Sequence, residues 1–328
     1  MLKPLPMTVA VTGATGFVGR HTVRALAARG HRVRALARSL EKLRAVLPDL
    51  PPNVEVVQGE VFDRAAMNDL CRGVGAVVHT IGIRKEVFPK STFERMHIAA
   101  TRLTIDAAAS AGARRFVLVS ALGVRPEGPT AYQQSKHAAE NLVRSSGLDW
   151  TIFRPSLIHG EDGEFMQMVK AWVLGRMTPH FFIPYFVRVE GKPPAPPKLV
   201  AAEMAPVWVR DVAGAIAASL ETDRAVGEVY TLTGPETMRW PELLRHIQDS
   251  LPASKESKKR LIPIPGRLGW AQAIGAKALG LANALPFGPS EPLLAMEDSV
   301  SNCSKAADHL GFNPAPFRAR VREYAGRV

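Results

Sequence analysis

The sequence predicts an α/β fold: a doubly wound parallel sheet followed by a smaller, mostly helical C-terminal lobe. Two observations carry this prediction. Short β-branched runs alternate with helical stretches over the first half of the chain, and the composition changes after Pro155. The chain has 328 residues, 46% of them apolar and 22% charged. That balance is typical of a folded protein and excludes disorder throughout.

Five strands are expected in the first half of the chain. Apolar or β-branched runs place them at Thr8–Thr12, His31–Ala37, Val54–Gln58, Ala76–Thr80 and Phe116–Ser120. Helices are expected from Gly16 to Arg29, where Gly30 ends the helix, and over the alanine-rich segment Phe93–Ala111. Strand–helix alternation with short links implies right-handed crossovers and hence parallel strands.

The second half of the chain has a different texture. Val207–Leu220 predicts the end of a strand and then an amphipathic helix, and Val229–Leu232 predicts another strand. The remaining segments are rich in Met, Phe and Pro, or are helical pieces separated by prolines. We therefore assign residues 1–160 and about 205–235 to the core, and residues 161–204 and 236–328 to a smaller substrate lobe.

Charge and cysteine content narrow the function classes. The net charge is +12, of which residues 1–160 carry +10. This excess favours an anionic partner such as a phosphorylated cofactor, a nucleic acid or a lipid surface; an arginine-rich composition is the alternative explanation. Two cysteines exclude a disulfide scaffold and an all-cysteine metal site, and no metal is expected. Without a secretory signal or an uninterrupted apolar run of membrane-spanning length, the sequence predicts a cytoplasmic protein with no transmembrane span.

A glycine-rich turn joins the first strand to the first helix. It reads Val11-Thr-Gly-Ala-Thr-Gly-Phe-Val-Gly19, with a strand before it and a helix after it, as a dinucleotide-binding turn requires. The first glycine permits the tight turn, the second lets the backbone approach a pyrophosphate, and the third allows close helix–sheet packing. A Rossmann-type NAD(P)-binding core follows, with cofactor contacts expected at Gly13, Thr15, Gly16, Phe17 and Gly19.

Arg38 follows the second strand, where such cores distinguish the two dinucleotides. An acid there bonds the ribose 2′-hydroxyl, whereas an arginine pairs with a 2′-phosphate. No acidic residue occurs before Glu41, so we favour NADP(H), with NAD(H) still possible. A solvated arginine at a strand end is the alternative.

A serine, a tyrosine and a lysine form the expected catalytic set. Tyr132 and Lys136 are four residues apart on a predicted helix and therefore share one face. The lysine is expected to lower the pKa of the phenol, so that Tyr132 acts as acid or base in a hydride transfer, and to bond the nicotinamide ribose. Ser120, at a strand end, is expected to donate to the substrate oxygen.

Taken together these motifs resemble the extended and atypical branches of the short-chain dehydrogenase/reductase superfamily. The Gly-x-x-Gly-x-x-Gly spacing, Val78-His-Thr-Ile-Gly82, Tyr132-x-x-x-Lys136 and Arg154-Pro-Ser156 carry the resemblance. Within the superfamily the sequence looks most like relatives of the 39 kDa NADPH-holding accessory subunit of respiratory complex I. The resemblance implies further cofactor contacts, at Glu60 and Val61 near the adenine, at Thr80, Ile81 and Gly82, and at Pro155 near the nicotinamide.

One position departs from the superfamily pattern. His97 stands where an asparagine usually supports a water relay behind the lysine. A histidine can pass protons, and a histidine packed under the sheet is the equal alternative. This departure bears on turnover and not on cofactor binding.

Two classes of function remain. The first is an NAD(P)-dependent oxidoreductase or epimerase/dehydratase-type enzyme acting on a small molecule, for which an apolar substrate is one option. The second is a catalytically quiet NADP(H)-binding accessory or assembly protein of a membrane (respiratory) complex. A nucleic-acid partner is not expected, because nothing in the sequence resembles a nucleic-acid module.

Two apolar stretches of the predicted lobe have open interpretations. Nine aromatic and methionine residues between Phe165 and Phe186 favour a lobe core over an apolar ligand pocket. Leu268–Phe287, preceded by the basic residues 255–260, is interpreted as an ordinary lobe helix, with peripheral association with a membrane as the alternative.

Overall fold

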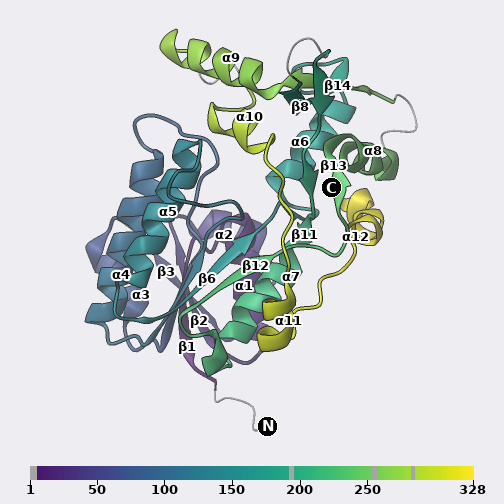
Figure 1. The fold of residues 1–328 in the computed structure, drawn as a ribbon. Helices are drawn as coiled ribbons and strands as arrows, with labels where there is room; N and C mark the ends of the chain where they lie inside the picture. The colour runs from purple at the N-terminus through teal and green to yellow at the C-terminus, as the bar shows by residue number, and fades with distance from the viewer. Residues whose placement is uncertain (1–5, 192–195, 253–257, 282–284) are drawn as a thin grey trace.

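The computed structural model describes residues 6–191, 196–252, 258–281 and 285–328 (Figure 1). Its centre is a seven-stranded, all-parallel sheet in the order β12-β6-β5-β4-β1-β2-β3. The strands are β1 Thr8–Thr12, β2 Arg32–Ala37, β3 Val54–Gln58, β4 Ala76–His79, β5 Arg115–Val119, β6 Asp149–Pro155 and β12 Glu228–Leu232. The five strands predicted in the first half are confirmed to within one residue at each end.

Helices cover both faces of this sheet (Figure 1). They are α1 Phe17–Ala28, α2 Leu40–Val46, α3 Arg64–Cys71, the π-helical turn η1 Glu94–Ala99, α4 Ala100–Ser110, α5 Ala131–Arg144, α7 Val209–Ser219 and the short η2 Asp223–Ala225. One apolar cluster joins the sheet to α1 and α7 through residues such as Leu26 and Ile216. The other joins it to α3, α4 and α5 through residues such as Leu70 and Val143. The sheet is therefore doubly wound, as predicted.

The strand order reverses between β1 and β4. The chain builds β1, β2 and β3 outward in one direction and then crosses back, so that β4 pairs with the other side of β1 and Thr12 lies opposite His79. In open parallel sheets, ligands bind beyond the carboxyl ends of the strands at such a reversal. The fold thus fixes where the functional site is to be sought.

The second part of the chain forms a lobe with its own apolar core. Its elements are β7 Ile158–His159, α6 Glu164–Val173, β8 Phe182–Glu190, β9 Lys198–Val200, β10 Glu203–Met204, β11 Val207–Trp208, β13 Met238–Arg239, α8 Trp240–Ser250, β14 Arg260–Pro265, α9 Gly266–Ala278, α10 Ser290–Leu294, α12 Phe317–Tyr324 and η5 Ala325–Arg327. Met166 and Trp172 of the aromatic stretch lie in this core with Leu244 and Phe317. They therefore serve packing.

The lobe differs from the prediction in two respects. It contains a three-stranded sheet, β14-β8-β9, in addition to its helices. Strand β14 was not predicted because it contains Pro263 and Pro265. Proline is tolerated there because β14 is an edge strand. The segment 236–328 also does not stay in the lobe: α11 (Ser304–Leu310) packs on the core, where Ala306 and Phe312 join the cluster around α1. The predicted lobe boundary needs this correction, because apolar residues of α11 fill the face beside β12.

Candidate functional site

The glycine-rich turn between β1 and α1 has the geometry of a phosphate-binding turn. Gly13 has φ +74°, a conformation that favours glycine, and its carbonyl accepts a 2.8 Å hydrogen bond from the Gly16 amide. A Cβ atom on Gly13 would lie 2.6 Å from Thr80 Oγ1, and one on Gly19 would collide with the Gly13 carbonyl. Both glycines are thus needed for the turn to pack against α1 and against the segment after β4.

The first turn of α1 has no anionic or capping side chain of its own. Gly16 is its N-cap and makes no side-chain cap, and the first turn holds no acidic residue. Amides at a helix start need acceptors, and the helix dipole favours negative charge there. Since Gly16 is exposed and carries no Cβ, the residues present fit the pyrophosphate of a dinucleotide.

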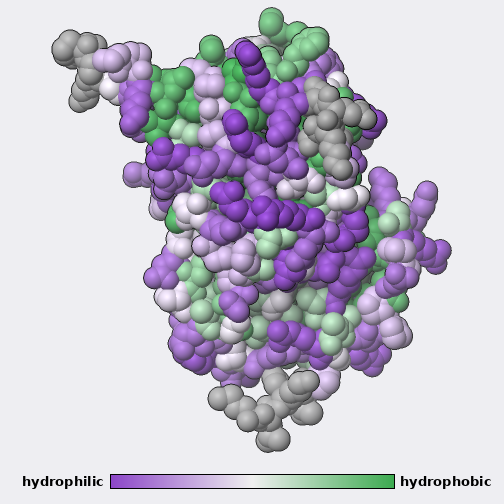
Figure 2. Space-filling view, turned by 90° about the vertical axis from the view of Figure 1, so that its right-hand side faces the viewer, coloured by the Kyte–Doolittle hydropathy of each residue, from purple (hydrophilic) through white to green (hydrophobic). Residues whose placement is uncertain are grey.

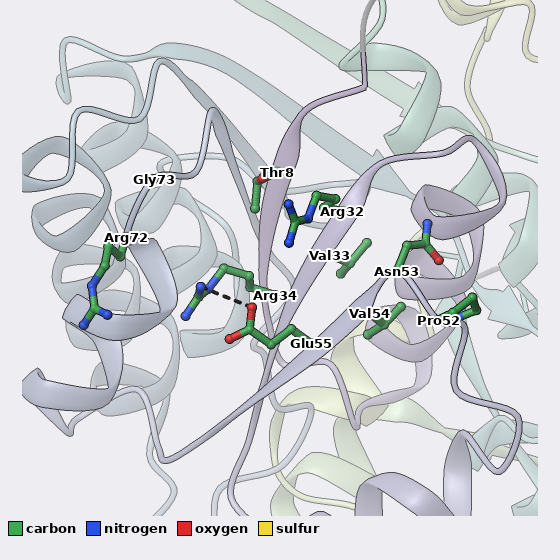
Figure 3. A pocket seen from close by; sticks show the side chains of 10 residues that line it. All are labelled: Thr8, Arg32, Val33, Arg34, Pro52, Asn53, Val54, Glu55, Arg72 and Gly73. Atoms are coloured by element: carbon green, nitrogen blue, oxygen red, sulfur yellow. Dashed lines mark ion pairs between the residues drawn. The ribbon is translucent and has the colours of Figure 1, made fainter.

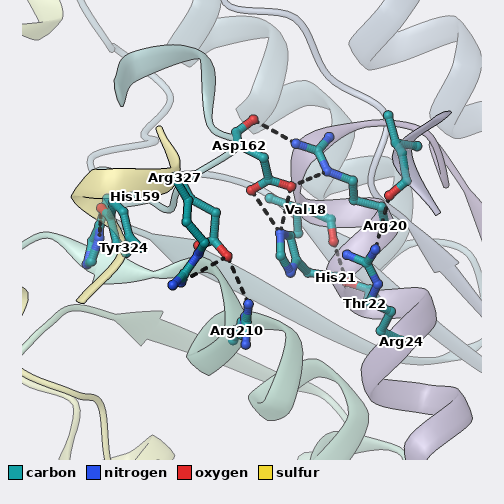
Figure 4. Close-up of polar contacts among 12 residues, drawn as sticks. Val18, Arg20, His21, Thr22, Arg24, His159, Asp162, Arg210, Tyr324 and Arg327 are labelled. Atoms are coloured by element: carbon teal, nitrogen blue, oxygen red, sulfur yellow. Dashed lines mark hydrogen bonds and ion pairs between the residues drawn. The ribbon is translucent and has the colours of Figure 1, made fainter. Parts of the chain in front are cut away.

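Phe17 lies at the start of α1, against the loop that leads into the lobe. A Cβ on Gly163 would be 2.8 Å from the Phe17 ring. One turn further along α1, Arg20 Nε and His21 Nε2 lie 2.6 and 3.1 Å from carboxylate oxygens of Asp162 (Figure 4). Burial acts against ionisation, but the hydrogen bonds from His21 and Arg20 hold the pKa of Asp162 well below its usual range. Here the ring of Phe17 connects core and lobe.

The residues predicted to bind adenosine follow β2 and β3. Arg38 comes directly after β2, is exposed, and forms no ion pair within the described part of the chain. Glu60 is exposed and Val61 is buried, both beyond the end of β3. Because β1, β2 and β3 are parallel neighbours, the residues that follow them lie at the same end of the sheet as the glycine-rich turn, beyond the carboxyl ends of the strands.

Lys136 of α5 reaches the segment that follows β4. Its Nζ donates to the Val119 carbonyl at 3.1 Å and lies 2.9 Å from where a Cβ on Gly82 would stand. Burial lowers the pKa of this ammonium to about 8, although nearby Glu140 opposes the shift. Thr80, whose hydroxyl donates to the Thr12 carbonyl at 2.8 Å, precedes Ile81 and Gly82 in this segment.

Tyr132 packs against aromatic rings and is partly buried. Its ring meets those of Phe93 and His97 edge to face, with centroids 5.8 and 5.5 Å away. Burial raises the pKa of Tyr132 to about 12; Glu291 adds to the rise and Arg84 opposes it. The expected lowering of this pKa by Lys136 is therefore wrong for the free chain, since burial dominates.

Ser120 differs from the expectation. Its hydroxyl donates a 2.6 Å hydrogen bond to Glu140 of α5, so its proton is already committed. Glu140 is fully buried and also accepts from Arg154 and Arg144 at 2.6 and 2.8 Å. Burial disfavours the carboxylate, but these hydrogen bonds lower the net pKa of Glu140, which stays ionised. In this arrangement Ser120 is one of three hydrogen-bond donors to the buried carboxylate of Glu140.

Sequence reasoning missed Glu140. The available signal was its position four residues after Lys136, on a helix face that packs against the sheet. Pro155, predicted to border the nicotinamide, is the last residue of β6 and is buried opposite Leu232.

Both nitrogens of His97 are occupied. Ser135 Oγ donates to the Tyr132 carbonyl at 2.9 Å, so the serine oxygen is left to accept a hydrogen bond from His97 Nδ1 at 2.8 Å. On the other side of the ring, the Ile83 amide donates to Nε2 at 3.1 Å. Burial and Lys136 lower the pKa of His97 to about 2. The imidazole is therefore neutral and ties the segment after β4 to α5. These contacts match the packed alternative for His97.

Two clefts lie away from these residues. One, of about 290 Å³, is at the amino ends of β1, β2 and β3, where Arg32, Arg34 and Arg72 surround it (Figure 3). The other, of about 470 Å³, lies in the lobe between α8 and β14. Within the described ranges no group of three or more His, Cys, Asp or Glu side chains is arranged to hold a metal ion.

Known proteins provide independent evidence on family. A family model described as NAD(P)H-binding matches residues 13–171. A (4-alkanoyl-5-oxo-2,5-dihydrofuran-3-yl)methyl phosphate reductase of Streptomyces griseus is 33% identical over 326 residues, 97% of this chain and 98% of the relative. A ceramide reductase of Caulobacter vibrioides is 40% identical over 152 residues, slightly less than half of either chain.

Two further similarities concern the complex I resemblance and the fold. NADH dehydrogenase [ubiquinone] 1 alpha subcomplex subunit 9 of Arabidopsis thaliana is 27% identical over 298 residues, 89% of this chain and 68% of the relative. A short-chain dehydrogenase/reductase superfamily protein of Agrobacterium tumefaciens, solved with bound NAD, superposes with a TM-score of 0.63 at 22% identity, covering 97% of this chain and 95% of its own. The chain therefore belongs to the same NAD(P)H-binding family as the Streptomyces reductase, and its fold is that of the short-chain dehydrogenase/reductase superfamily.

Proposed function

We propose that this protein is an NADP(H)-dependent reductase in which Tyr132 donates the proton. The observation that carries the proposal is the position of Tyr132 and Lys136 on α5, with Lys136 against the segment that follows β4, beside the glycine-rich turn. A phenol whose pKa is raised to about 12 holds its proton at neutral pH. The proton that the reducing direction requires is therefore present on Tyr132, although burial makes the phenol a weaker acid.

Each residue has a separate task in this proposal. The bound dinucleotide supplies the hydride. The amides at the start of α1 hold the pyrophosphate, with Gly13 and Gly19 shaping the turn. Lys136, still largely protonated at neutral pH, bonds the nicotinamide ribose hydroxyls, and Tyr132 passes its phenolic proton to the substrate oxygen. Ser120 acts through Glu140 and positions α5.

For the substrate we propose an alkyl-bearing carbonyl compound, or a carbonyl-conjugated alkene. The two reductases described above support this, since one is named for ceramide and the other for an alkanoyl butenolide phosphate. Phe93 and His97 pack around Tyr132 and offer the phenol no hydrogen-bond acceptor in the described residues, which suits a substrate with little polar surface.

The Tyr132→Phe variant tests the reductase proposal. NADPH oxidation would be followed with long-chain ketones and alkanoyl butenolides, and NADPH binding by fluorescence. Loss of the proton donor should lower turnover roughly a hundredfold or more, with NADPH affinity unchanged. Tyr185→Phe, a partly buried tyrosine in the lobe, is the matched control and should keep wild-type turnover. Equal turnover in both variants would remove Tyr132 from the chemistry.

We also propose a preference for NADP(H), through Arg38. The Arg38→Asp variant should lose roughly tenfold or more in NADPH affinity and gain affinity for NADH, because a charge-assisted bond to the 2′-phosphate is replaced by an acceptor for the 2′-hydroxyl. Arg32→Asp, at the other end of β2, controls for the change in net charge. An unchanged NADPH/NADH ratio in Arg38→Asp would defeat the assignment.

A second candidate is a catalytically quiet NADP(H)-holding accessory protein of a membrane complex. Two observations favour it: the similarity to the complex I subunit, and the Ser120 proton, which is committed to Glu140 rather than to a substrate. If this alternative holds, the wild type binds NADPH tightly but does not oxidise it with any of the ketone or butenolide probes. The Tyr132→Phe variant then has no effect on assembly of the membrane complex.

A further inference from the structure

The exposed hydrophobic side chains are concentrated in one part of the molecule. Most of the large ones in the described ranges lie in the lobe or on the loop beside it, among them Phe88, Leu268, Trp270, Ile274, Leu279 and Leu281. Figure 2 shows hydrophobic residues gathered in the upper part of the molecule, whereas hydrophilic ones dominate the rest of that face. Patches of this kind mark interaction surfaces.

Helix α9 has an inverted burial pattern. Its buried residues are the small Gly266, Gly269 and Ala273, and a Cβ on Gly269 would collide with the Phe186 ring. Its large residues face outward: Leu268 is 53% exposed and Ile274 is 43% exposed. A helix that folds only against its own lobe does the opposite. The outer face of α9 is therefore built to contact something outside the chain.

Cations accompany this apolar face. Residues 258–281 contain five Lys and Arg residues and no Asp or Glu. Lys258 pairs with Asp249 at 2.7 Å and Lys277 with Glu86 at 3.6 Å. Arg260 and Arg267 form no ion pair within the described ranges, so the surface keeps a positive excess.

We propose that α9, with Leu279 and Leu281 after it, lies on the surface of an anionic membrane. An apolar face flanked by unpaired cations fits anionic lipid headgroups above an acyl boundary, and a tryptophan such as Trp270 is suited to that boundary. A second copy of the chain fits less well, because an isologous contact would bring the same cations together. No helix in the described ranges has the length and hydropathy to cross a bilayer, so the contact is peripheral.

None of the proposed catalytic residues lies on this surface. In Figure 1, α9 projects at the top of the view, away from the central sheet. The proposal therefore stands whether the protein is a reductase or an accessory protein.

Vesicle flotation of the full chain tests the proposal. The wild type should float with vesicles of phosphatidylglycerol and phosphatidylcholine, and much less with phosphatidylcholine alone. The double variant Leu268→Ser/Ile274→Ser should reduce the bound fraction roughly tenfold or more, because two apolar side chains no longer enter the acyl boundary. Arg267→Gln should reduce it about fivefold, since each cation near the surface contributes ~1 kcal/mol.

Matched controls separate this surface from a general effect. Leu103→Ser removes a leucine of 39% exposure on α4, and Arg32→Gln removes an exposed cation at the amino end of β2; both should float like the wild type. NADPH binding by every variant confirms folding. Equal flotation of the α9 variants and controls, or no flotation of the wild type, would overturn the proposal. A concentration-dependent dimer that the α9 variants abolish would assign the surface to a second copy instead.

Discussion

At the scale of single residues, the buried carboxylate of Glu140 changes how the site is understood. It accepts hydrogen bonds from Ser120 on the β5 side, Arg154 of β6 and Arg144 of its own helix. A buried anion with fewer partners would be costly, whereas this one is fully satisfied. Glu140 thus anchors α5, and with it Tyr132 and Lys136, to the ends of two strands.

The Ser120→Ala variant tests this role of the serine. Removing one hydrogen bond to a charged group should lower the free energy of unfolding by about 1.5–3 kcal/mol, measured by denaturant titration. Turnover with the ketone and butenolide probes should fall only slightly. A hundredfold loss of turnover with unchanged stability would instead restore Ser120 as a donor to the substrate, because removing such a donor typically costs that much.

The sequence predicts those site residues whose positions are decided by their spacing along the chain. Gly13, Gly16 and Gly19 are set by the turn, and Tyr132 and Lys136 by the helical repeat, so their positions follow from the chain. The direction of the Ser120 hydroxyl was not predictable. It depends on Glu140, which lies twenty residues further along the chain, and the pKa of Tyr132 depends on burial by other segments.

At the scale of elements, the contact between α1 and the turn before it depends on the absence of a side chain at Gly19. A Cβ there would collide with the Gly13 carbonyl. Since that carbonyl belongs to the backbone and also accepts from Gly16, it cannot move without opening the turn. The packing of α1 and the shape of the phosphate turn are thus one feature.

The Gly19→Ala variant should therefore lose both stability and cofactor. We expect the free energy of unfolding to fall by about 1–3 kcal/mol, as for other overpacked sites, and NADPH affinity to fall with it. Gly214→Ala in α7 is the control, since its Cβ would meet nothing within 4 Å and should stabilise the helix by up to about 1 kcal/mol. Normal NADPH affinity in Gly19→Ala would contradict the coupling between packing and phosphate binding.

Elements of the lobe were harder to predict than those of the core. The core strands are buried on both faces and appear as continuous apolar runs. Strand β14 instead contains two prolines in its last three residues and is partly exposed, so the sequence pattern favours a loop. The helix predicted over Leu268–Phe287 corresponds to α9, which spans Gly266–Ala278. The sequence left open whether this helix packs in the lobe or lies on a membrane, because small residues decide which of its sides is buried.

At the scale of the whole molecule, three apolar clusters, one on each face of the sheet and one in the lobe, are joined by a chain that passes repeatedly between sheet and lobe. The chain leaves the sheet after β6, builds the lobe, returns for α7 and β12, and later returns again for α11. The order of strand–helix units predicts the sheet, since handedness leaves few alternatives. It does not predict the last return, which rests on a few apolar side chains of α11.

Buried neutral histidines connect these parts and predict how the molecule responds to acid. Burial lowers the pKa of His79 to about 3, of His97 to about 2 and of His159 to about 3, from a usual value of 6.5. His79 lies under the sheet reversal, His97 joins the segment after β4 to α5, and His159 bonds Tyr324 of α12 at 2.8 Å.

Stability should therefore fall as the pH drops below about 6.5. In the unfolded chain these three histidines take up protons there, whereas in the folded chain they do not until about pH 2–3, so each of them removes up to about 1.4 kcal/mol per pH unit. In thermal unfolding the His97→Asn variant should lose less stability between about pH 6.5 and about pH 5 than the wild type. His137→Asn, which alters a histidine on α5 that is not buried, should follow the wild type. A wild-type unfolding temperature that stays flat over this range would mean that these imidazoles accept protons without cost to the fold.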